Sequence, residues 1–255
     1  MNTSFSFVDT GAHNGAWNMA FDVQRAEALD AGLGTPLLRV YTWSPWCISL
    51  GRHQNSNEID CTRTEAAGYD VVHRPTGGRA ILHAEELTYS VVMHSEGRSI
   101  MDVYRMISEA LVAGLRTLAP TISVARTQAN FPKLYREPGG IPCFSSSARY
   151  EIEYEGRKLV GSAQRRIGST VLQHGSILIG DAHLALPDYL AVSEQVREQL
   201  RHDMRRHTIS LREILGGAIS ASEVAQAVHT GFERVWETDI PSLPGIEYIS
   251  NVVSG

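Results

Sequence analysis

The segment 141–179, IPCFSSSARYEIEYEGRKLVGSAQRRIGSTVLQHGSILI, constrains the fold of this chain more than any other stretch. Turn-forming residues divide it at Gly156 and at Gly168, since glycine and its small polar neighbours favour tight turns. Apolar and charged residues alternate over 150–154, which is typical of a half-buried strand. The run 171–179 is more continuously apolar, as in a strand that is buried on both faces. The segment therefore predicts three strands joined by two tight turns.

The rest of the chain alternates between helical and strand-like patterns, and no internal repeat or low-complexity linker divides it. We therefore predict an α/β (α+β) fold, in which one mixed, mostly antiparallel sheet is flanked by helices in a single domain over residues 1–255. Helices are expected at 15–31, 58–67, 101–118, 187–204, 211–215 and 221–236, strands at 1–12, 37–41, 47–51, 71–74 and 88–93, and a long loop at 121–142.

Composition limits the class of protein to which the chain can belong. Hydrophobic residues make up 43% of its 255 residues, which is enough to build a core. The net charge of −5 argues against a dedicated nucleic-acid binder. The three cysteines lie far apart without a CxxC pair, so neither a disulfide framework nor a zinc site is predicted. No secretory signal and no apolar run of membrane-spanning length is visible, and together these features predict a cytoplasmic location.

Two adjacent glycines, Gly77 and Gly78, follow the strand-like run at 71–74. Such a pair lets the backbone approach a ligand closely, and its amides can bind an anion or a carbonyl oxygen. On the glycines alone, a hairpin turn with a bulge is the simpler interpretation. The loop matches neither the GxxxxGK phosphate loop nor the dinucleotide fingerprint.

Basic residues are frequent in the glycine-bearing segments. Each alone is most simply a surface charge, but if they converge they would attract an acidic partner. The residues concerned are Arg74, Arg79, Arg157, Lys158, Arg165 and Arg166.

Cys143 is the candidate nucleophile. A lone cysteine is more often a small buried hydrophobe, as expected for Cys47 within a strand-like run, and nothing argues for a function of Cys61. Cys143 differs because it follows a Gly- and Pro-rich loop and precedes Lys158 across one hairpin. Because a nearby cation favours the reactive thiolate, Lys158 is the candidate electrostatic partner, with an exposed hairpin charge as the alternative.

His174 lies between apolar residues and precedes Gly175. A core or substrate-orienting histidine is a better interpretation here than a general base. No second histidine or carboxylate stands nearby at ligand spacing, so no metal site is predicted. A serine hydrolase is not predicted either, because the chain lacks the GxSxG elbow.

Several motifs together resemble the lipoate-protein ligase and octanoyltransferase superfamily, which is related to the biotin-protein ligases. The run 73–83 (HRPTGGRAILH) resembles its glycine motif, 156–164 (GRKLVGSAQ) its lysine motif, and 172–178 (LQHGSIL) its His-Gly strand. The runs 18–22 (NMAFD) and 51–54 (GRHQ) fit its N-terminal pattern. The resemblance covers nearly the whole chain and implies one catalytic domain of the biotin/lipoate protein ligase type.

Details within these motifs resemble the cysteine-dependent octanoyltransferases most closely. ATP-dependent lipoate ligases usually have a third glycine where this chain has Arg79, and they need no cysteine. One departure is His73, where the family usually has an arginine, so the charge of the loop is weaker. The resemblance implies that Cys143 and Lys158 are catalytic. It also implies a set of acyl- and substrate-binding residues: Arg74, Thr76, Gly77, Gly78, Arg79, His83, Gly161, Ser162, Gln164, His174 and Gly175.

The implied reaction transfers an octanoyl group from octanoyl-acyl carrier protein to a lysine of a lipoyl domain, such as that of the glycine-cleavage H protein, without a cofactor. The Cys143 thiolate would carry the group as a thioester. Three alternatives remain open: an ATP-dependent lipoate-protein ligase, an amidotransferase that takes octanoate from H protein to dehydrogenase lipoyl domains, and a non-catalytic module that binds acylated lipoyl domains.

Overall fold

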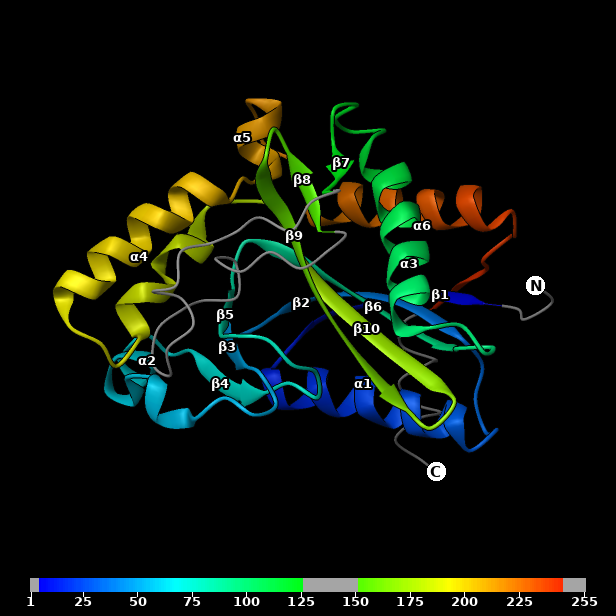
Figure 1. The fold of residues 1–255 in the computed structure, drawn as a ribbon, viewed down its shortest axis with the longest axis horizontal. Coiled ribbons are helices and arrows are strands. Elements are labelled where there is room, and N and C mark those ends of the chain that lie inside the picture. The colour runs from blue at the N-terminus through cyan, green and yellow to red at the C-terminus, as the bar shows by residue number, and fades with distance from the viewer. Residues whose placement is uncertain (1–4, 126–150, 245–255) are drawn as a thin grey trace.

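The computed structural model describes residues 5–125 and 151–244, and its strands form two sheets (Figure 1). The strands are β1 (Ser6–His13), β2 (Leu37–Trp43), β3 (Cys47–Leu50), β4 (Asp70–His73), β5 (Ile81–His83), β6 (Glu86–His94), β7 (Ser123–Val124), β8 (Ile152–Tyr154), β9 (Arg157–Ile167), β10 (Thr170–Leu178) and β11 (Ser242–Leu243). The larger sheet has the order β11-β1-β2-β6-β10-β9-β8-β7. Its strands are antiparallel except where β1 pairs with β11 and β2, which confirms a mixed, mostly antiparallel sheet.

Helices cover both faces of the larger sheet, with α1 on one side and α3 and α6 on the other (Figure 1). The α-helices are α1 (Gly15–Asp30), α2 (Cys61–Ala66), α3 (Ile100–Leu115), α4 (Glu194–His207), α5 (Leu211–Leu215) and α6 (Ala221–Trp236), and the 3₁₀ helices are η1 (Ser56–Glu58) and η4 (Ala182–Tyr189). No helix in the described part of the chain is long and apolar enough to cross a membrane.

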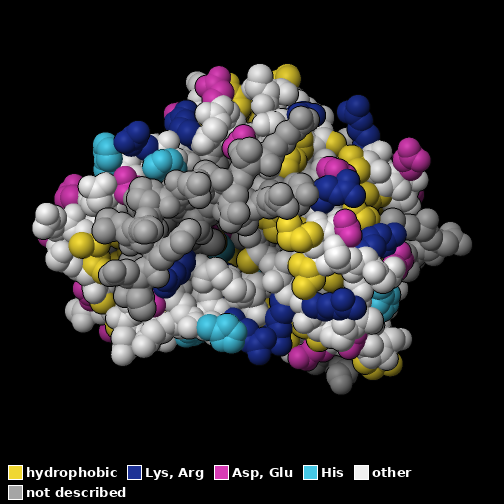
Figure 2. All heavy atoms as spheres, viewed as in Figure 1, with side chains coloured by type: hydrophobic (Ala, Val, Ile, Leu, Met, Phe, Trp, Pro, Cys, Tyr) yellow, Lys and Arg dark blue, Asp and Glu magenta, His cyan; other side chains and the backbone are white. Residues whose placement is uncertain are grey.

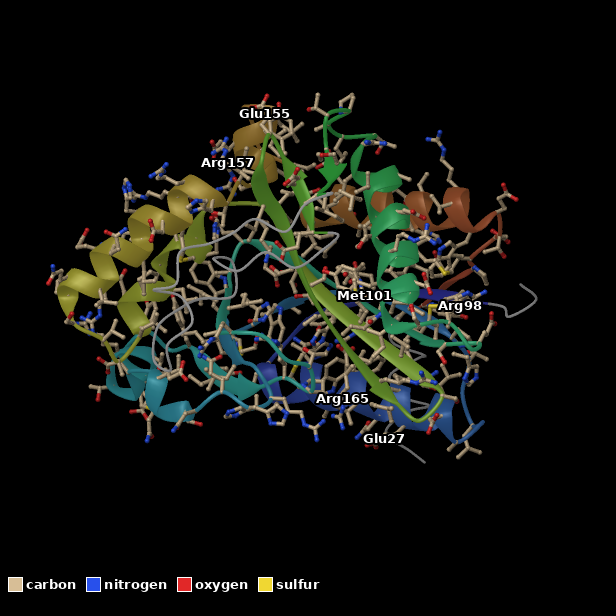
Figure 3. All side chains as sticks on the ribbon, viewed as in Figure 1. Glu27, Arg98, Met101, Glu155, Arg157 and Arg165 are labelled. Carbon is tan, nitrogen blue, oxygen red and sulfur yellow. The ribbon has the colours of Figure 1, made fainter. Side chains whose placement is uncertain are left out.

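The predicted three-stranded meander is confirmed as β8, β9 and β10. Every residue of β10 is buried, as its continuous apolar pattern predicted, because β6 and β9 flank it and helices cover both faces. The tip of the β8–β9 hairpin reaches α5, where Arg157 pairs with Glu213 at 2.7 Å (Figure 3). The meander thus forms the half of the larger sheet that lies farther from β1.

The face of the larger sheet toward α3 and α6 is apolar. Along β6, Leu87, Tyr89, Val91 and Met93 point to this side, in the alternation that a pleated strand imposes. They pack against the apolar stripes of the two helices in the main core of the protein. Ser220 and Glu223 form a capping box that begins α6, close to the start expected at 221.

The opposite face of the larger sheet is polar where α1 and the smaller sheet cover it. Here Arg39 and Tyr41 of β2, Thr88 of β6, and His174 and Ser176 of β10 are buried with apolar neighbours. α1 begins after Asn14, as the expected helix at 15–31 requires, and the Asn14 side chain accepts a hydrogen bond from the Trp17 amide. Burial of charged groups costs free energy unless they are paired, so such groups need partners on this face. The same face carries the candidate site.

The sequence did not predict that the expected strands separate into two sheets. β3 pairs in parallel with β4 and antiparallel with β5, and these three strands form the smaller sheet beside α1. Short apolar runs predict strands but not their neighbours, because pairing depends on contacts far apart in the sequence.

The helix expected at 187–204 is wrong as a single element. Residues 182–189 form η4, the chain is extended at Leu190, and α4 begins after Ser193, whose side chain accepts a hydrogen bond from the Val196 amide. Because serine is a strong N-cap, it starts a new helix here in place of a continuous one. The helix expected at 58–67 is shorter, since Asp60 caps α2 after η1 has ended at Glu58.

The basic residues of the glycine-bearing segments occupy different parts of the described structure. Figure 3 shows Arg157 and Arg165 toward opposite ends of β9. Arg79 lies 3.5 Å from Glu58. Figure 2 shows Lys and Arg side chains spread over this face among acidic ones, with no single basic patch. Arg157 and Arg165 therefore do not meet at one site for an acidic partner.

Candidate functional site

A narrow cavity lies between the polar face of the larger sheet, the smaller sheet and α1. The larger sheet contributes one wall from β2, β6, β9 and β10. The other wall comes from the smaller sheet and from the loop between β4 and β5, residues 74–80, which carries Gly77 and Gly78 and is called the glycine loop below. Its lining residues are Met19, Tyr41, Trp43, Ser49, Arg74, Ile81, His83, Thr88, Gly161, Ser162, Ala163, His174, Gly175 and Ser176.

A chain of buried hydrogen bonds links α1, β2, β10 and the glycine loop along this cavity. Asp22 accepts a hydrogen bond from Arg39 at 2.8 Å, and its second oxygen lies 3.2 Å from His174 Nδ1 and from the Tyr41 hydroxyl. On the other side of the ring, His174 Nε2 lies 2.7 Å from Thr76 Oγ1. The position of the glycine loop is therefore tied to a buried ion pair on the far side of His174.

The charge state of this chain follows from its partners. Burial by itself would raise the pKa of the Asp22 carboxyl, but Arg39 and then His174 more than offset burial, so its pKa lies below the ordinary value. Burial, followed by the neighbouring Asp22 charge, raises the pKa of Tyr41 well above its usual range. Asp22 is therefore an anion and Tyr41 a neutral hydrogen-bond donor at neutral pH.

A second polar chain runs from the smaller sheet to β2. Ser49 Oγ lies 2.8 Å from His83 Nε2, and His83 Nδ1 lies 3.2 Å from Glu86 Oε1. The same carboxylate oxygen accepts from Thr88 at 2.6 Å, and Thr88 in turn accepts from the Trp43 indole at 2.8 Å. Burial lowers the pKa of His83 despite the opposing effect of Glu86, so the imidazole is neutral at neutral pH.

Arg74 holds the glycine loop from inside the protein. Its guanidinium donates to the backbone carbonyls of Ser49 at 2.9 Å, of Gly77 at 2.9 Å and of Arg79 at 2.7 Å. Arg74 is buried, so these bonds form away from competing water. A guanidinium that satisfies three carbonyls fixes the loop conformation and also carries a positive charge at the cavity wall.

Two buried oxygens, one on the cavity wall at Ser176 and one on Glu86 behind His83, have hydrogen-bonding capacity left over. Neither Ser176 Oγ nor Glu86 Oε2 has a hydrogen-bond partner among the described residues. Because most buried polar atoms in proteins are paired, Ser176 Oγ marks a place on the cavity wall where a polar group or water can bind. Met19, Trp43 and Ile81 add apolar surface, so the lining of the cavity combines apolar walls with polar groups.

Two glycines are required by close backbone approaches at the site. A β-carbon on Gly175 would lie 2.6 Å from the Gly161 carbonyl oxygen, and one on Gly51 would lie 1.9 Å from that of Gly78. Side chains at these positions would therefore displace β9 or the glycine loop. This contact explains why a glycine follows His174 in the His-Gly strand.

The structure brings together most of the binding residues predicted from the sequence. Gly77 and Arg79 accept from Arg74 through their carbonyls, and Gly78 approaches Gly51. Gln164 does not line the cavity and donates to Gln173 at 3.1 Å. The members that line the cavity or bond to a lining residue are Arg74, Thr76, Gly77, Arg79, His83, Gly161, Ser162, His174 and Gly175.

The two predicted catalytic residues have different outcomes. Cys143 lies outside the described residues. Lys158 is buried near the start of β9, does not line the cavity and pairs with Glu151 at 2.5 Å. The exposed hairpin charge that was the alternative for Lys158 is therefore wrong. Cys47 is fully buried, as expected, and burial raises the pKa of its thiol far above the usual range.

Sequence reasoning missed several polar residues of the site. Asp22 and Arg39 form its central ion pair, and Ser49 and Glu86 flank His83. The available signal was a charged residue within an otherwise apolar strand pattern, as at Arg39 in LLRVY. Among the described residues no group of three histidine, cysteine or carboxylate side chains is arranged to hold a metal ion.

Comparison with protein families matches residues 14–233 to the lipoyl protein ligase A/B catalytic domain. An octanoyltransferase LipM of Kyrpidia tusciae is 40% identical over 235 residues, which cover 90% of this chain and 86% of that protein. The octanoyltransferase LipM of Bacillus subtilis is 34% identical, covering 90% and 85% of the two chains.

Solved structures with a similar fold are lipoate-protein ligases. A bipartite lipoate protein ligase from Thermoplasma acidophilum superposes with a TM-score of 0.74 at 20% identity, covering 98% of this chain and 91% of the other. A lipoate-protein ligase A bound with ATP gives a TM-score of 0.71 at 21% identity, covering 98% and 93%. At these identities the likeness shows the fold alone, which agrees with the α/β class predicted from the sequence.

Proposed function

The chain belongs to the lipoyl protein ligase A/B catalytic domain family and is an acyltransferase, and we propose that it moves an octanoyl group from octanoyl-acyl carrier protein to a lysine of a lipoyl domain in lipoate biosynthesis. One observation carries this proposal: relatives named octanoyltransferase match about nine tenths of the chain at 34–40% identity. The glycine-cleavage H protein is the acceptor that we expect.

The cavity supports the proposal because it combines apolar walls with polar groups. Met19, Trp43 and Ile81 would contact the hydrocarbon tail, and His83, Thr88 and Ser176 would bind its polar end or an ordered water. About six methylenes buried at roughly 0.8 kcal/mol each contribute about 5 kcal/mol of binding. One methylene changes binding by about 1–3 kcal/mol, so such a cavity measures chain length only coarsely.

The proposed chemistry has two steps through a thioester on Cys143. In the first, the Cys143 thiolate sulfur attacks the acyl carbonyl carbon, the bond to the carrier sulfur breaks, and the carrier leaves as a thiolate that takes a proton. In the second, the neutral acceptor amine attacks the same carbon, the bond to Cys143 breaks, and the amide nitrogen loses a proton. Both steps pass through a tetrahedral oxyanion, which the Lys158 ammonium would stabilise.

The other residues that the family motifs imply, apart from Cys143 and Lys158, are proposed to bind or position the substrate. The Arg74 contacts hold Gly77 and Gly78 in a conformation that lets the backbone flank the acyl chain. The chain from Asp22 through His174 to Thr76 keeps this loop against β10. The residues proposed to bind or position substrate are Arg74, Thr76, Gly77, Gly78, Arg79, His83, Gly161, Ser162, Gln164, His174 and Gly175.

The test is acyl transfer in the absence of nucleotide. Purified protein is mixed with labelled octanoyl-acyl carrier protein and an apo lipoyl domain, and the label on the lipoyl domain is measured with and without ATP. We expect transfer without ATP at the same rate as with it. Label that reaches the lipoyl domain only from free octanoate and ATP would establish a ligase, and label that comes only from octanoyl-H protein would establish an amidotransferase.

A further inference from the structure

We infer that Glu151 is a positioning residue for acyl transfer, which holds the ammonium group of Lys158 in place through a buried ion pair. The inference rests on the role proposed above for Lys158. Lys158 Nζ lies 2.5 Å from Glu151 Oε1, and the two side chains are only 7% and 6% exposed. A charge-assisted hydrogen bond this short and this buried fixes the position of the cation.

The hairpin places two glutamates within reach of Lys158, and only one of them is buried. Glu153 is the residue directly opposite Lys158 in the β8–β9 register, and a β-bulge separates that pair from the next, Ile152 with Val160. The contact at 2.5 Å is nevertheless made by Glu151, which precedes β8. Glu153 is partly exposed, and burial followed by the charge of Glu151 raises the pKa of its carboxyl.

The backbone around the ion pair is held on both sides. The carbonyl of Glu151 accepts from the Ala125 amide at 2.7 Å, and the carbonyl of Lys158 accepts from the Ile209 amide at 3.0 Å. Ile152 and Leu159, next to the two charged residues, belong to the main apolar core. Lys158 therefore lies on β9 and Glu151 directly before β8, and backbone hydrogen bonds and core neighbours hold both residues, which favours precise placement of a charge.

Stability alone does not explain this pair. Removing two charges from water is expensive, and a buried ion pair is often no more stable than two apolar residues of similar volume. The ion pair does have a clear consequence for the direction of the lysine side chain. Lys158 lies three residues before Gly161, the first residue of β9 on the cavity wall, so roughly 10 Å of strand separates them.

At that distance the direction of the side chain decides whether its ammonium can reach the reacting carbonyl. A misplacement of about 1 Å can reduce the rate of a positioned reaction by about 100-fold. The Glu151 carboxylate selects one direction and supplies the opposite charge that a buried ammonium needs. Glu151 does not touch the substrate in this account, so its effect passes entirely through Lys158.

The experiment is a double-mutant cycle in the full chain, with octanoyl transfer as the readout. Glu151→Gln keeps the shape of the side chain and removes its charge, and we expect kcat to fall by about 100-fold with the KM values for donor and acceptor within about twofold of wild type. In the Lys158→Ala background, the same Glu151→Gln change should alter the remaining rate by less than about twofold. Glu153→Gln, the same substitution on the same hairpin, is the matched control and should retain wild-type kcat.

The outcomes separate this inference from the proposed function. Wild-type kcat for Lys158→Ala would overturn the role of Lys158, and the inference about Glu151 would fail with it. A large loss for Lys158→Ala with wild-type kcat for Glu151→Gln would overturn only the inference. An equal loss from Glu151→Gln in both backgrounds would show a structural role and overturn it too.

A second variant covers the case in which Glu151→Gln does not fold. Glu151→Asp keeps the carboxylate but shortens the side chain by one methylene, so the ammonium would be held off its position. We expect the midpoint temperature of its thermal unfolding to stay close to that of wild type, while its kcat falls by about tenfold. Wild-type kcat for Glu151→Asp would contradict the positioning role.

Discussion

The two faces of the larger sheet are built on the same strands but by different rules. Toward α3 and α6, residues such as Leu87 and Val91 form an apolar core, which tolerates changes that conserve volume. Toward α1 and the smaller sheet, Arg39, Thr88 and His174 are equally buried, but they are held by directed hydrogen bonds. The difference indicates that one face supplies stability and the other positions the groups of the cavity.

The largest effect is expected where the polar face carries a charge that loses its partner. Arg39→Met removes the guanidinium that donates to Asp22, and a buried carboxylate without its partner costs about 3–5 kcal/mol. We expect the free energy of unfolding, measured by denaturant titration, to fall by that amount. Adding Asp22→Asn to this variant removes the stranded charge and should recover at least half of the loss. A loss below about 1 kcal/mol for Arg39→Met would contradict the account of this face.

The apolar face should show loss of stability without loss of catalysis. Leu111 of α3 is fully buried in the main core, and Leu111→Ala removes its side chain and leaves a cavity. We expect unfolding to become easier by about 3 kcal/mol. At a temperature where the variant is still folded by circular dichroism, its kcat should remain within about twofold of wild type. A Leu111→Ala variant that is folded but inactive would contradict the claim that the apolar face contributes to stability and not to catalysis.

Lowering the pH should reduce the free energy of unfolding through the protonation of His83 on the polar face. Burial lowers the pKa of this histidine in the folded protein, so the folded state binds fewer protons than the unfolded one. Its contribution to stability is therefore complete above the unfolded value of about 6.5 and is lost as the pH falls toward the lower folded value. Stability should fall with pH by up to about 1.4 kcal/mol per unit from this one group.

The matched measurement is the same pH series on His83→Gln. We expect a shallower fall in stability below pH 6.5 in the variant than in wild type. Burial lowers the pKa of His183 to about 4, so His183 acts in the same direction in both proteins and cancels in the comparison. Parallel curves for the two proteins would contradict a neutral, buried His83.

The smallest effect is expected at the link between the two walls of the cavity. Thr76→Val keeps the shape of the side chain but removes the hydroxyl that lies 2.7 Å from His174 Nε2. Loss of this buried hydrogen bond should lower the free energy of unfolding by about 1–2 kcal/mol. Because the glycine loop would no longer be tied to β10, the KM for the acyl donor should rise more than that of the acceptor. Unchanged KM values would show that the hydrogen bond between Thr76 and His174 does not contribute to substrate binding.

The fold could be predicted from the sequence where the pattern is local and continuous. The turns at Gly156 and Gly168 and the apolar run of β10 lie within one segment, and they were predicted in place. The smaller sheet was not predicted, because the pairing of β3 with β4 and β5 depends on contacts outside each short run. The prediction of one helix over 187–204 was wrong because Ser193 caps a new helix. This cap outweighs the helical propensity of the residues between η4 and α4.

The candidate site shows the same division. His83, His174 and the glycine loop lie in recognisable motifs, and the structure gathers them around one cavity. Asp22 and Arg39 were missed because they are separated by 17 residues on different elements, and only packing brings them together. Glu151 was missed for a related reason, since its role is visible only through its contact with Lys158.

The most direct test of the central claim is whether the acyl group becomes attached to Cys143. Protein mixed with octanoyl-acyl carrier protein alone is analysed by intact-mass and peptide mass spectrometry, with and without hydroxylamine. We predict one octanoyl group per chain, located on Cys143 and removed by hydroxylamine, which is present in Cys47→Ala and Cys61→Ala but absent in Cys143→Ala, a variant that should not turn over. An adduct on another residue, or full turnover by Cys143→Ala, would contradict the thioester mechanism.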